Sequence, residues 1–240
     1  MKVSILMPAF NEAAHLEQVV DLVMSMPQDK EVILVDDGSS DGTADIMRRL
    51  ALRPGITALF HESNQGKGAG VQTALGAASG DVVILQDCDL EYDPKDYVAL
   101  LRPIEAGEAE VVFGRRELSL ANSFNLVFFL GNRFLAAWTN VLFNARIHDL
   151  MTAYKVMRIE VARELHLTER RYGIEPEITG TLLNLGYRVH EVPVWYQSRS
   201  RAEGKKPQWH AGLGIAVTLV RIRLRRRQML QARGQRSPAA

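Results

Sequence analysis

Short apolar runs alternate with longer amphipathic segments along the first half of the chain. A short apolar run predicts a buried strand, whereas apolar residues that recur at helical spacing predict a helix. The predicted strands cover residues 3–7, 31–36, 56–60, 81–86 and 110–113, and the predicted helices cover residues 12–25, 42–52, 66–78 and 94–103. This alternation is typical of the α/β class, with a mostly parallel sheet flanked by helices.

The pattern changes between residues 122 and 143, where polar and apolar side chains divide into two helical stripes. We expect an amphipathic helix pair here, packed on the sheet or lying on a membrane surface. A strand near residues 154–157, a helix near 177–185 and a strand that ends at Pro193 follow. A basic loop over 199–206 leads to a closing helix rich in arginine. The predicted organisation is a domain over residues 1–210 and a basic amphipathic helix and tail over 211–240.

The composition excludes several classes of protein. The chain has 240 residues, of which 47% are hydrophobic and 24% charged, as in one ordinary globular domain. Its single cysteine excludes a disulfide framework and a zinc site made of several cysteines. We expect a cytoplasmic protein, because no signal peptide follows Met1 and the apolar run at 211–220 is too short to cross a bilayer.

The net charge of +1 conceals a strong asymmetry. From Arg199 onward there are 11 basic residues and one acid, whereas the first 198 residues hold 18 basic and 27 acidic residues. A basic tail indicates an anionic partner such as phosphate, a lipid surface or nucleic acid, or else a solvated helix end. We expect no nucleic acid, because acids clustered at the predicted strand ends would repel its phosphates.

Acidic residues follow two of the predicted strands. Asp87 and Asp89 come after the apolar run 82–85, and residues two apart on an extended chain point the same way. Their oxygens, together with those of a diphosphate, suit Mg²⁺ or Mn²⁺, although a solvated acidic turn is the alternative. Cys88 between them can point into the core. After the second strand, Asp36 and Asp37 can take hydrogen bonds from a base or ribose.

Two further local features surround these acids. Asp41 can cap the helix that begins near Gly42. The segment 66–70 is rich in glycine but matches neither the dinucleotide fingerprint nor a P-loop. Its amides, at a helix start beside Lys67, would still suit a phosphate or sugar hydroxyls.

Taken together, these pieces resemble the family 2 glycosyltransferases of the GT-A fold. The similar branch includes dolichyl-phosphate mannosyltransferase and the bacterial polyprenyl-phosphate glycosyltransferases. The matching segments appear in the order of that family: 8–12, 35–43, 64–68, 86–94, 114–116, 131–133, Asp149 with Tyr154 and Lys155, 203–206 and Trp209. Each match is weak alone, but their order over nearly the whole chain is specific.

The resemblance implies a role for individual residues. Donor-binding positions are Pro8, Ala9, Asn11, Glu12, Asp36, Asp37, Lys67, Asp87 and Cys88. Asp87 and Asp89 would bind Mg²⁺ or Mn²⁺, and the acceptor phosphate would meet Arg115, Arg133, Arg199 and Lys205. The residues expected to act in catalysis are Asp89, Asp149 and Arg133.

The function that the resemblance implies is metal-dependent transfer, with inversion, of a sugar from a GDP- or UDP-sugar to a polyprenyl or dolichyl phosphate. A phosphate acceptor is already ionised, whereas a hydroxyl of a soluble sugar, glycan or lipid would need a base, for which Asp149 is the candidate. A nucleotide-sugar-binding protein without turnover is a further alternative. The basic loop over 199–206 would close over the site.

The chain departs from its relatives at two places. Many relatives continue into transmembrane helices, whereas here residues 212–227 alternate apolar residues with arginine, which predicts peripheral attachment to an anionic leaflet. Met151 stands where relatives often carry Glu, which leaves the acceptor open.

Overall fold

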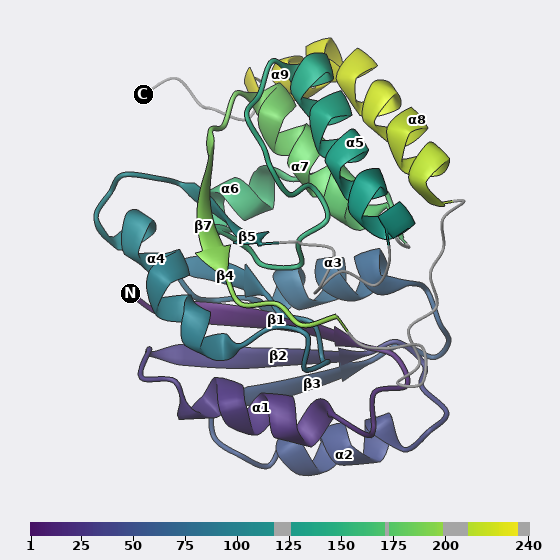
Figure 1. The fold of residues 1–240 in the computed structure, drawn as a ribbon. Coiled ribbons are helices and arrows are strands. Elements are labelled where there is room, and N and C mark those ends of the chain that lie inside the picture. Colours follow the sequence, from purple (N-terminus) through teal and green to yellow (C-terminus); the bar gives the residue numbers. More distant parts are fainter. Residues whose placement is uncertain (118–125, 171–172, 199–210, 235–240) are drawn as a thin grey trace.

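The fold is an α/β/α sandwich built on one twisted sheet (Figure 1). The computed structural model describes residues 1–117, 126–170, 173–198 and 211–234. Within this part the sheet has seven strands in the order β3-β2-β1-β4-β6-β5-β7, and β6 alone runs antiparallel to its neighbours. The strands are β1 (Val3–Ala9), β2 (Lys30–Asp36), β3 (Ile56–Phe60), β4 (Val82–Leu85), β5 (Val111–Arg116), β6 (Lys155–Arg158) and β7 (Val189–Val194). The predicted α/β class and mostly parallel sheet are confirmed.

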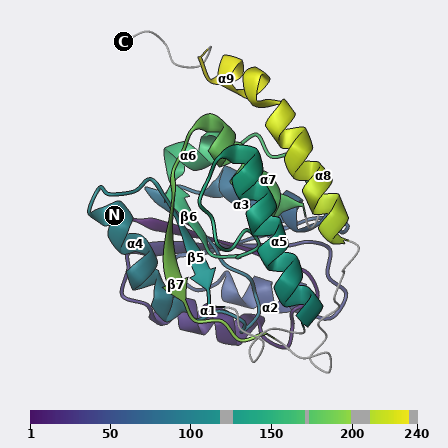
Figure 2. The same ribbon diagram turned by 45° about the horizontal axis from the view of Figure 1, so that its top comes forward.

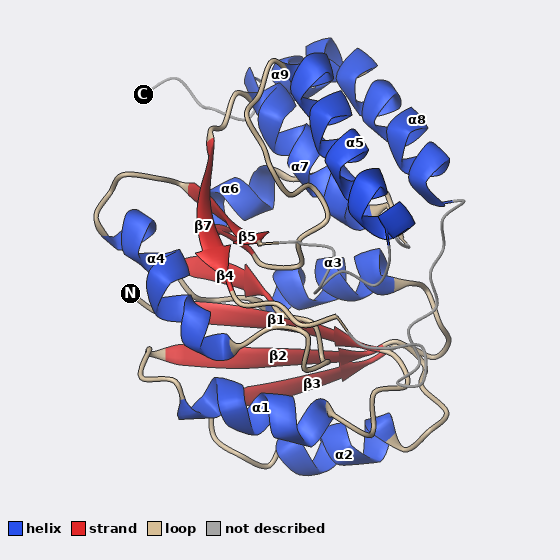
Figure 3. Cartoon of the chain, viewed as in Figure 1, coloured by secondary structure: helices blue, strands red, loops and turns tan. Residues whose placement is uncertain are grey.

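Helices cover both faces of the sheet (Figures 1 and 3). One face carries α1 (Leu16–Ser25), α2 (Thr43–Leu50) and α4 (Tyr97–Glu105), the last preceded by a 3₁₀ turn, η1 (Pro94–Asp96). The other carries α3 (Lys67–Ala77), α6 (Ile159–Glu164) and α7 (Ile174–Leu185). Because side chains alternate along a strand, Ile5 of β1 packs with the first group and Leu6 with the second. Each face of the sheet therefore has its own hydrophobic core.

A third group of helices lies beyond the α7 side: α5 (Leu126–Phe143), α8 (Ala211–Leu224) and α9 (Arg226–Gly234). Helix α8 runs beside α5 and α7 and adds Ile215 and Leu219 to a small core with Leu135 and Leu150 (Figure 2). The expected helix pair over 122–143 is one helix of 18 residues in the described part, and it packs on α7 and α8 rather than on the sheet. The closing helix is divided into α8 and α9 at Arg225.

Helix α5 buries polar as well as apolar side chains and exposes other apolar ones. Asn132 and Thr139 are buried, whereas Leu130, Phe134 and Val141 are exposed. The buried hydroxyl is satisfied within the helix, where Thr139 donates to the Leu135 carbonyl at 2.8 Å. No helix in the described ranges is both long enough and apolar enough to span a bilayer.

Several elements differ from the prediction at their ends. Helix α1 begins at Leu16 instead of residue 12, because residues 11–13 form a turn whose amides bond to Ser39, Thr43 and Asp41. Strand β5 continues to Arg116, where it pairs with β7. Helix α6 was not predicted, since its six residues are too few to show a period.

The start of α3 is packed tightly enough to require glycine, which generates a stability prediction. A Cβ at Gly68 would lie 2.0 Å from the Glu169 carbonyl oxygen, whereas a Cβ at Gly76 in the same helix meets nothing within 4 Å. We expect Gly68→Ala to lower the free energy of unfolding by about 1–3 kcal/mol through overpacking. Gly76→Ala should raise it by about 0.5–1 kcal/mol through helix propensity. Urea unfolding of both variants tests this, and equal effects would contradict it.

Candidate active site

The carboxyl ends of the parallel strands gather the predicted motifs at one edge of the sheet. Asn11, which has a positive φ of 56°, donates its amide to Ser39 Oγ, and its side-chain oxygen accepts from the Ser40 amide, both at 2.9 Å. The N-cap residue of α2 is Gly42, which has no side-chain capping bond, so the predicted cap by Asp41 is not formed at that position. Asp41, one residue earlier, accepts from the Thr43 amide at the start of α2 and from the Ala13 amide of the neighbouring loop. The loops after β1 and β2 are thereby joined.

The two acids after β2 differ in what they hold. Asp36 is buried and accepts weakly from the Ser39 amide. Asp37 is buried too, and its oxygens accept from the Gln65 and Gly66 amides at 2.9 and 2.7 Å while His61 Nδ1 lies 2.8 Å away. Asp37 therefore holds the loop before α3 in place, and its contact with a donor stays a prediction.

The amides at the start of α3 are already used by the protein. The Gly66 amide donates to Asp37, and the Gly68 amide donates to the Arg170 carbonyl at 2.8 Å. The expectation that these glycine amides are open to a phosphate is therefore wrong for both positions.

Lys67, the first residue of α3, forms an ion-paired bridge across the site. Its ammonium lies 2.6 Å from Asp87 Oδ1 and 2.7 Å from Glu175 Oε1 of α7. Burial opposes the charge on the ammonium, but the two carboxylates outweigh it and raise the pKa of Lys67 well above its usual value. The bridge joins α3, the loop after β4 and α7.

The segment after β4 bends instead of staying extended, and each of its three residues has its own environment. Asp87 is partly exposed. Asp89 is nearly buried, and its Oδ1 accepts a hydrogen bond from the Glu91 amide at 3.1 Å. Cys88 points into the core as expected, with its sulfur 3.5 Å from the Pro8 carbonyl oxygen. Burial and the neighbouring acids raise the pKa of the Cys88 thiol well above its usual value, so the thiol stays protonated and serves as a packing group.

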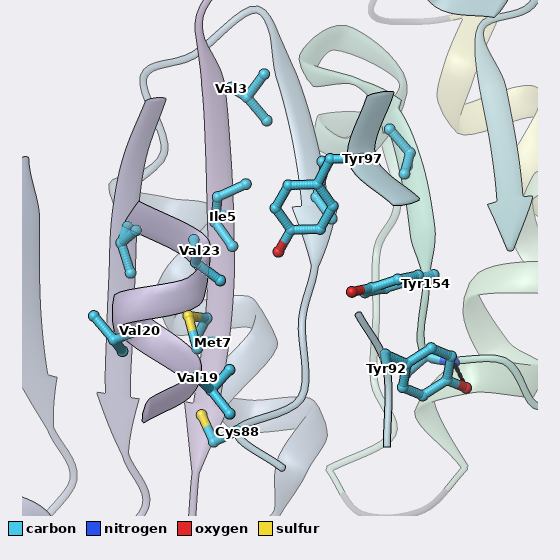
Figure 4. Close-up of a cluster of buried hydrophobic side chains, with 14 of the residues drawn as sticks. Val3, Ile5, Met7, Val19, Val20, Val23, Cys88, Tyr92, Tyr97 and Tyr154 are labelled. Carbon is cyan, nitrogen blue, oxygen red and sulfur yellow. Dashed lines mark hydrogen bonds between the residues drawn. The ribbon is translucent and has the colours of Figure 1, made fainter. Parts of the chain in front are cut away.

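A cluster of four tyrosines supports this loop from the core side, three of which Figure 4 labels. Tyr97 and Tyr154 both donate to the Gln86 side-chain oxygen, at 2.7 and 2.9 Å, and Gln86 in turn donates to the Asp87 carbonyl. The rings of Tyr92 and Tyr154 lie 4.6 Å apart. The fourth member, Tyr196, packs on Tyr92 and donates to Glu91 at 3.1 Å. The loop is thus held by aromatic packing. Tyr92 and Tyr154 belong to the matching segments of the sequence, but no packing role was predicted for them.

On the opposite side of the site, Asp149 is engaged by a buried arginine. Arg116 makes a bidentate contact with its carboxylate, at 2.6 and 2.8 Å, and adds a backbone hydrogen bond at 3.2 Å. Burial opposes the charge on Arg116, but Asp149 outweighs it and raises the arginine pKa further. Asp149 is 3% exposed, so its carboxylate faces Arg116 rather than solvent.

The basic residues predicted to meet an acceptor are distributed differently. Arg115 is partly exposed at the end of β5, with Glu117 at 3.9 Å. Arg133 is exposed on α5, its guanidinium 5.9 Å from the centre of the Phe129 ring. Arg199 and Lys205 lie outside the described residues.

A buried lysine lies on the strand between these two halves. Lys155 of β6 is fully buried, donates to the Leu150 carbonyl at 3.1 Å and lies 4.0 Å above the Phe113 ring. Burial lowers the pKa of Lys155 to about 7, although Glu175 and Asp149 raise it in part. The field of these acids reaches Lys155 from both sides.

Comparison with known proteins places this chain in a family. The glycosyl transferase family 2 model matches residues 4–165, more than half of the chain. The chain belongs to glycosyl transferase family 2. Its sheet and helices have the GT-A fold, and the chain is a glycosyltransferase.

Individual relatives support the assignment. This glycosyltransferase is 26% identical over 227 residues to a dolichyl-phosphate hexose transferase of Haloferax volcanii, covering 95% of this chain and 96% of that protein. It is 26% identical over 218 residues to an undecaprenyl-phosphate mannosyltransferase of Micrococcus luteus, covering 85% and 87%. Mycobacterium tuberculosis glucosyl-3-phosphoglycerate synthase, crystallised with Mn²⁺, UDP-glucose and phosphoglyceric acid, superimposes with a TM-score of 0.69 at 22% identity, covering 94% and 79%.

The residues at the β4 end fit a divalent cation by their chemistry. Asp87 and Asp89 offer hard oxygen atoms, and Asp87 already binds a cation, the Lys67 ammonium. The described residues contain no group of three or more protein ligands that could hold a metal without further donors. A glycosyltransferase metal site of this kind would be completed by diphosphate oxygens and water.

Arg116 and Lys155 belong to the matching segments but were given no role, and Glu175 was not named at all. Arg116 is separated from Arg115 only by the alternation along β5, which turns position 116 inward with Val112 and Gly114. Glu175 lies in the first turn of α7, which begins at Ile174, three residues before the predicted start, and no sequence pattern links Glu175 to Lys67.

The buried lysine generates a prediction about pH. The folded glycosyltransferase releases the Lys155 proton near pH 7, whereas the unfolded chain keeps it up to about pH 10. Between these values the unfolded state binds more protons, so stability rises with pH, by up to about 1.4 kcal/mol per pH unit. We expect the unfolding free energy of the wild type to rise relative to Lys155→Met from pH 7 to 10. Urea unfolding at three pH values measures this. The matched Lys95→Met change should show no such trend, and a flat difference for Lys155 would contradict the prediction.

Proposed function

We propose that this glycosyltransferase moves a hexose, with inversion, from a nucleoside diphosphate sugar to a polyprenyl phosphate. The curated relatives named above act on dolichyl and undecaprenyl phosphates and match nearly their full lengths. The GDP- or UDP-sugar would lie over the carboxyl ends of β1, β2 and β4, where the loops that carry Asn11, Glu12 and Asp36 meet.

The observation that carries this proposal is the state of Asp149. A hydroxyl acceptor needs a base, but both oxygens of this carboxylate are engaged by Arg116 and the group is buried. A carboxylate held by a bidentate arginine is a poor proton acceptor, because protonation would leave the buried guanidinium unpaired. A phosphate acceptor is ionised at neutral pH and needs no base, so the pairing favours a phosphate.

The remaining residues divide between donor and acceptor. Asp87 and Asp89 would hold Mg²⁺ or Mn²⁺, which when bound neutralises the charge of the departing diphosphate. Asp149 would keep Arg116 and the end of β5 in place beside Arg115, which is exposed enough to meet a phosphate. Attack on the anomeric carbon from the face opposite the diphosphate gives inversion.

An acceptor comparison tests the reaction. We expect radiolabelled hexose from GDP- or UDP-sugar, in the presence of Mn²⁺, to pass to polyprenyl phosphate and not to the polyprenol of the same length. The anomeric coupling in the product should show inversion. Asp89→Asn should lower the rate by about 100-fold or more, since stabilisation of the leaving group is worth several kcal/mol.

The other outcomes separate the alternatives. Transfer to the polyprenol, a glycan or a soluble sugar, with none to the phosphate, would establish a hydroxyl acceptor. Tight nucleotide-sugar binding without transfer to any acceptor would indicate a protein that binds the donor only.

We also propose that the protein works at the surface of an anionic membrane. Helix α5 exposes an apolar stripe on one side, with no charged residue among its members: Leu126, Leu130, Phe134, Ala137 and Val141. The neighbouring α8 and α9 expose arginines, namely Arg221, Arg225, Arg226 and Arg227. An apolar helical face beside a basic one suits the headgroup region of an anionic leaflet.

Vesicle flotation tests this attachment. We expect binding to vesicles of phosphatidylglycerol and phosphatidylcholine, and weak binding to phosphatidylcholine alone. Leu130→Asp with Phe134→Asp should reduce binding by about tenfold or more, because two apolar side chains no longer insert. Leu52→Asp is the control, since this leucine is 86% exposed and comes just after α2, a helix on the other side of the molecule from α5 (Figure 1). Equal loss in the control would contradict the role of α5.

A further inference from the structure

The Asp87 carboxylate, in the proposed donor site, is already paired with a cationic side chain of the protein, that of Lys67. Asp87 is a predicted metal ligand, yet its Oδ1 lies 2.6 Å from the Lys67 ammonium. A divalent cation that binds Asp87 must either displace this ammonium or sit close to a like charge. Two like charges a few ångströms apart repel strongly in a partly buried site. The pairing therefore opposes binding of a metal ion that arrives alone.

Burial decides which of the two partners Lys67 can give up. The Asp87 side chain is 28% exposed, so a ligand entering from solvent can reach it. The Glu175 side chain is 11% exposed and is fixed in the first turn of α7. Lys67 can lose its bond to Asp87 and keep the one to Glu175, so its charge remains compensated during the exchange.

A nucleoside diphosphate changes the balance of charge. Its phosphates bring negative charge to the same edge of the sheet, where they can attract the ammonium of Lys67 and complete the coordination of a metal at Asp87. Lys67 is the start of α3, and the loop before it is fixed by Asp37, so its backbone does not need to move for the ammonium to turn.

We propose that Lys67 is an exchangeable counter-ion of Asp87. Its ammonium holds this carboxylate while no donor is bound and releases it to the divalent cation when the nucleoside diphosphate arrives. The inference rests on the proposed function and adds that metal and nucleotide bind cooperatively, with Lys67 as the coupling residue. By linkage, each ligand then raises the affinity for the other by the same factor.

Mn²⁺ binding measured by electron paramagnetic resonance tests the exchange without any transfer assay. The full chain is titrated with Mn²⁺ alone and with GDP or UDP, after subtraction of the Mn²⁺ held by the nucleotide in solution. For the wild type we expect weak binding of Mn²⁺ alone and stronger binding with one of the nucleotides. In Lys67→Met, Mn²⁺ alone should bind about tenfold more tightly, and the nucleotide should no longer strengthen it.

Matched variants separate the exchange from simpler effects. Lys67→Gln is also neutral, although it can still donate a hydrogen bond to Asp87. Because the exchange depends on the charge, Lys67→Gln should bind Mn²⁺ like Lys67→Met. Lys67→Arg keeps the charge and should bind Mn²⁺ alone as weakly as the wild type. Lys2→Met removes one charge from an ion pair with Glu31 at the opposite edge of the sheet and should change nothing. Melting curves confirm that each variant is folded.

The outcomes distinguish the inference from the function on which it rests. The exchange would be overturned if both neutral variants bound Mn²⁺ alone no more tightly than the wild type does, while the wild type still bound Mn²⁺ in the presence of a nucleotide. That result would leave the metal-dependent function standing. Absence of Mn²⁺ binding in the wild type, even with nucleotides, would overturn the metal site itself.

Discussion

The cost of burying charge organises the carboxyl edge of this sheet. Asp37 and Asp149 are both nearly buried there, and each oxygen-bearing group is met by protein donors from another segment of the chain. A buried charge without a partner costs several kcal/mol, so each acid forces a loop or strand end into one position. The same rule operates at the amino edge of the sheet. Burial raises the pKa of Glu31 there, but hydrogen bonds from Lys2, Ser4 and Ser79 outweigh burial and lower this pKa to about 2. Charge pairing thus fixes the loops that the hydrophobic cores leave undetermined.

The same constraint joins the two halves of the molecule. The half with the residues expected to bind the donor consists of β1 to β4 with their loops, and the other half carries Arg116, Asp149 and α7. Lys67 crosses between them to reach Glu175, while Lys155 lies buried where the fields of Glu175 and Asp149 overlap. These are the charges most sensitive to an anionic ligand, because a change in one is felt by the others across a poorly screened interior.

The sequence predicted the parallel half of the fold well, for a physical reason. Strands such as β1 and β4 are buried on both faces, so each appears as an uninterrupted apolar run. The motifs after them therefore fell at the correct edge. Elements beyond β5 were predicted less well, because α6 is short and α5 buries Asn132 and Thr139 while exposing leucines. A periodic pattern reveals that a helix has two faces, but it does not reveal which face meets the protein.

Site residues were predictable where the chemistry is local and were missed where it depends on tertiary contact. Cys88 was expected in the core and is there, 3% exposed, beside the partly exposed Asp87. The two tyrosines that donate to Gln86, Tyr97 and Tyr154, come from distant segments of the chain. The partner of Asp149, Arg116, differs from its neighbour Arg115 only by strand alternation. Such pairings follow from strand register and helix placement, which a single sequence does not contain.

The exposed apolar stripe of helix α5 makes physical sense if the acceptor has two chemistries. A polyprenyl phosphate has an anionic head and a long apolar tail, and a protein that binds it needs a basic group beside an apolar surface. Arg133 is exposed on α5, one helical turn from Leu130 and from Ala137, and thus borders the apolar stripe. Helix α5 packs Leu135 against α8 and buries Asn132 and Thr139, which leaves the apolar stripe from Leu126 to Val141 exposed. The hydrogen bond from Thr139 to the Leu135 carbonyl lowers the energetic cost of this burial, because the buried hydroxyl is not left without an acceptor.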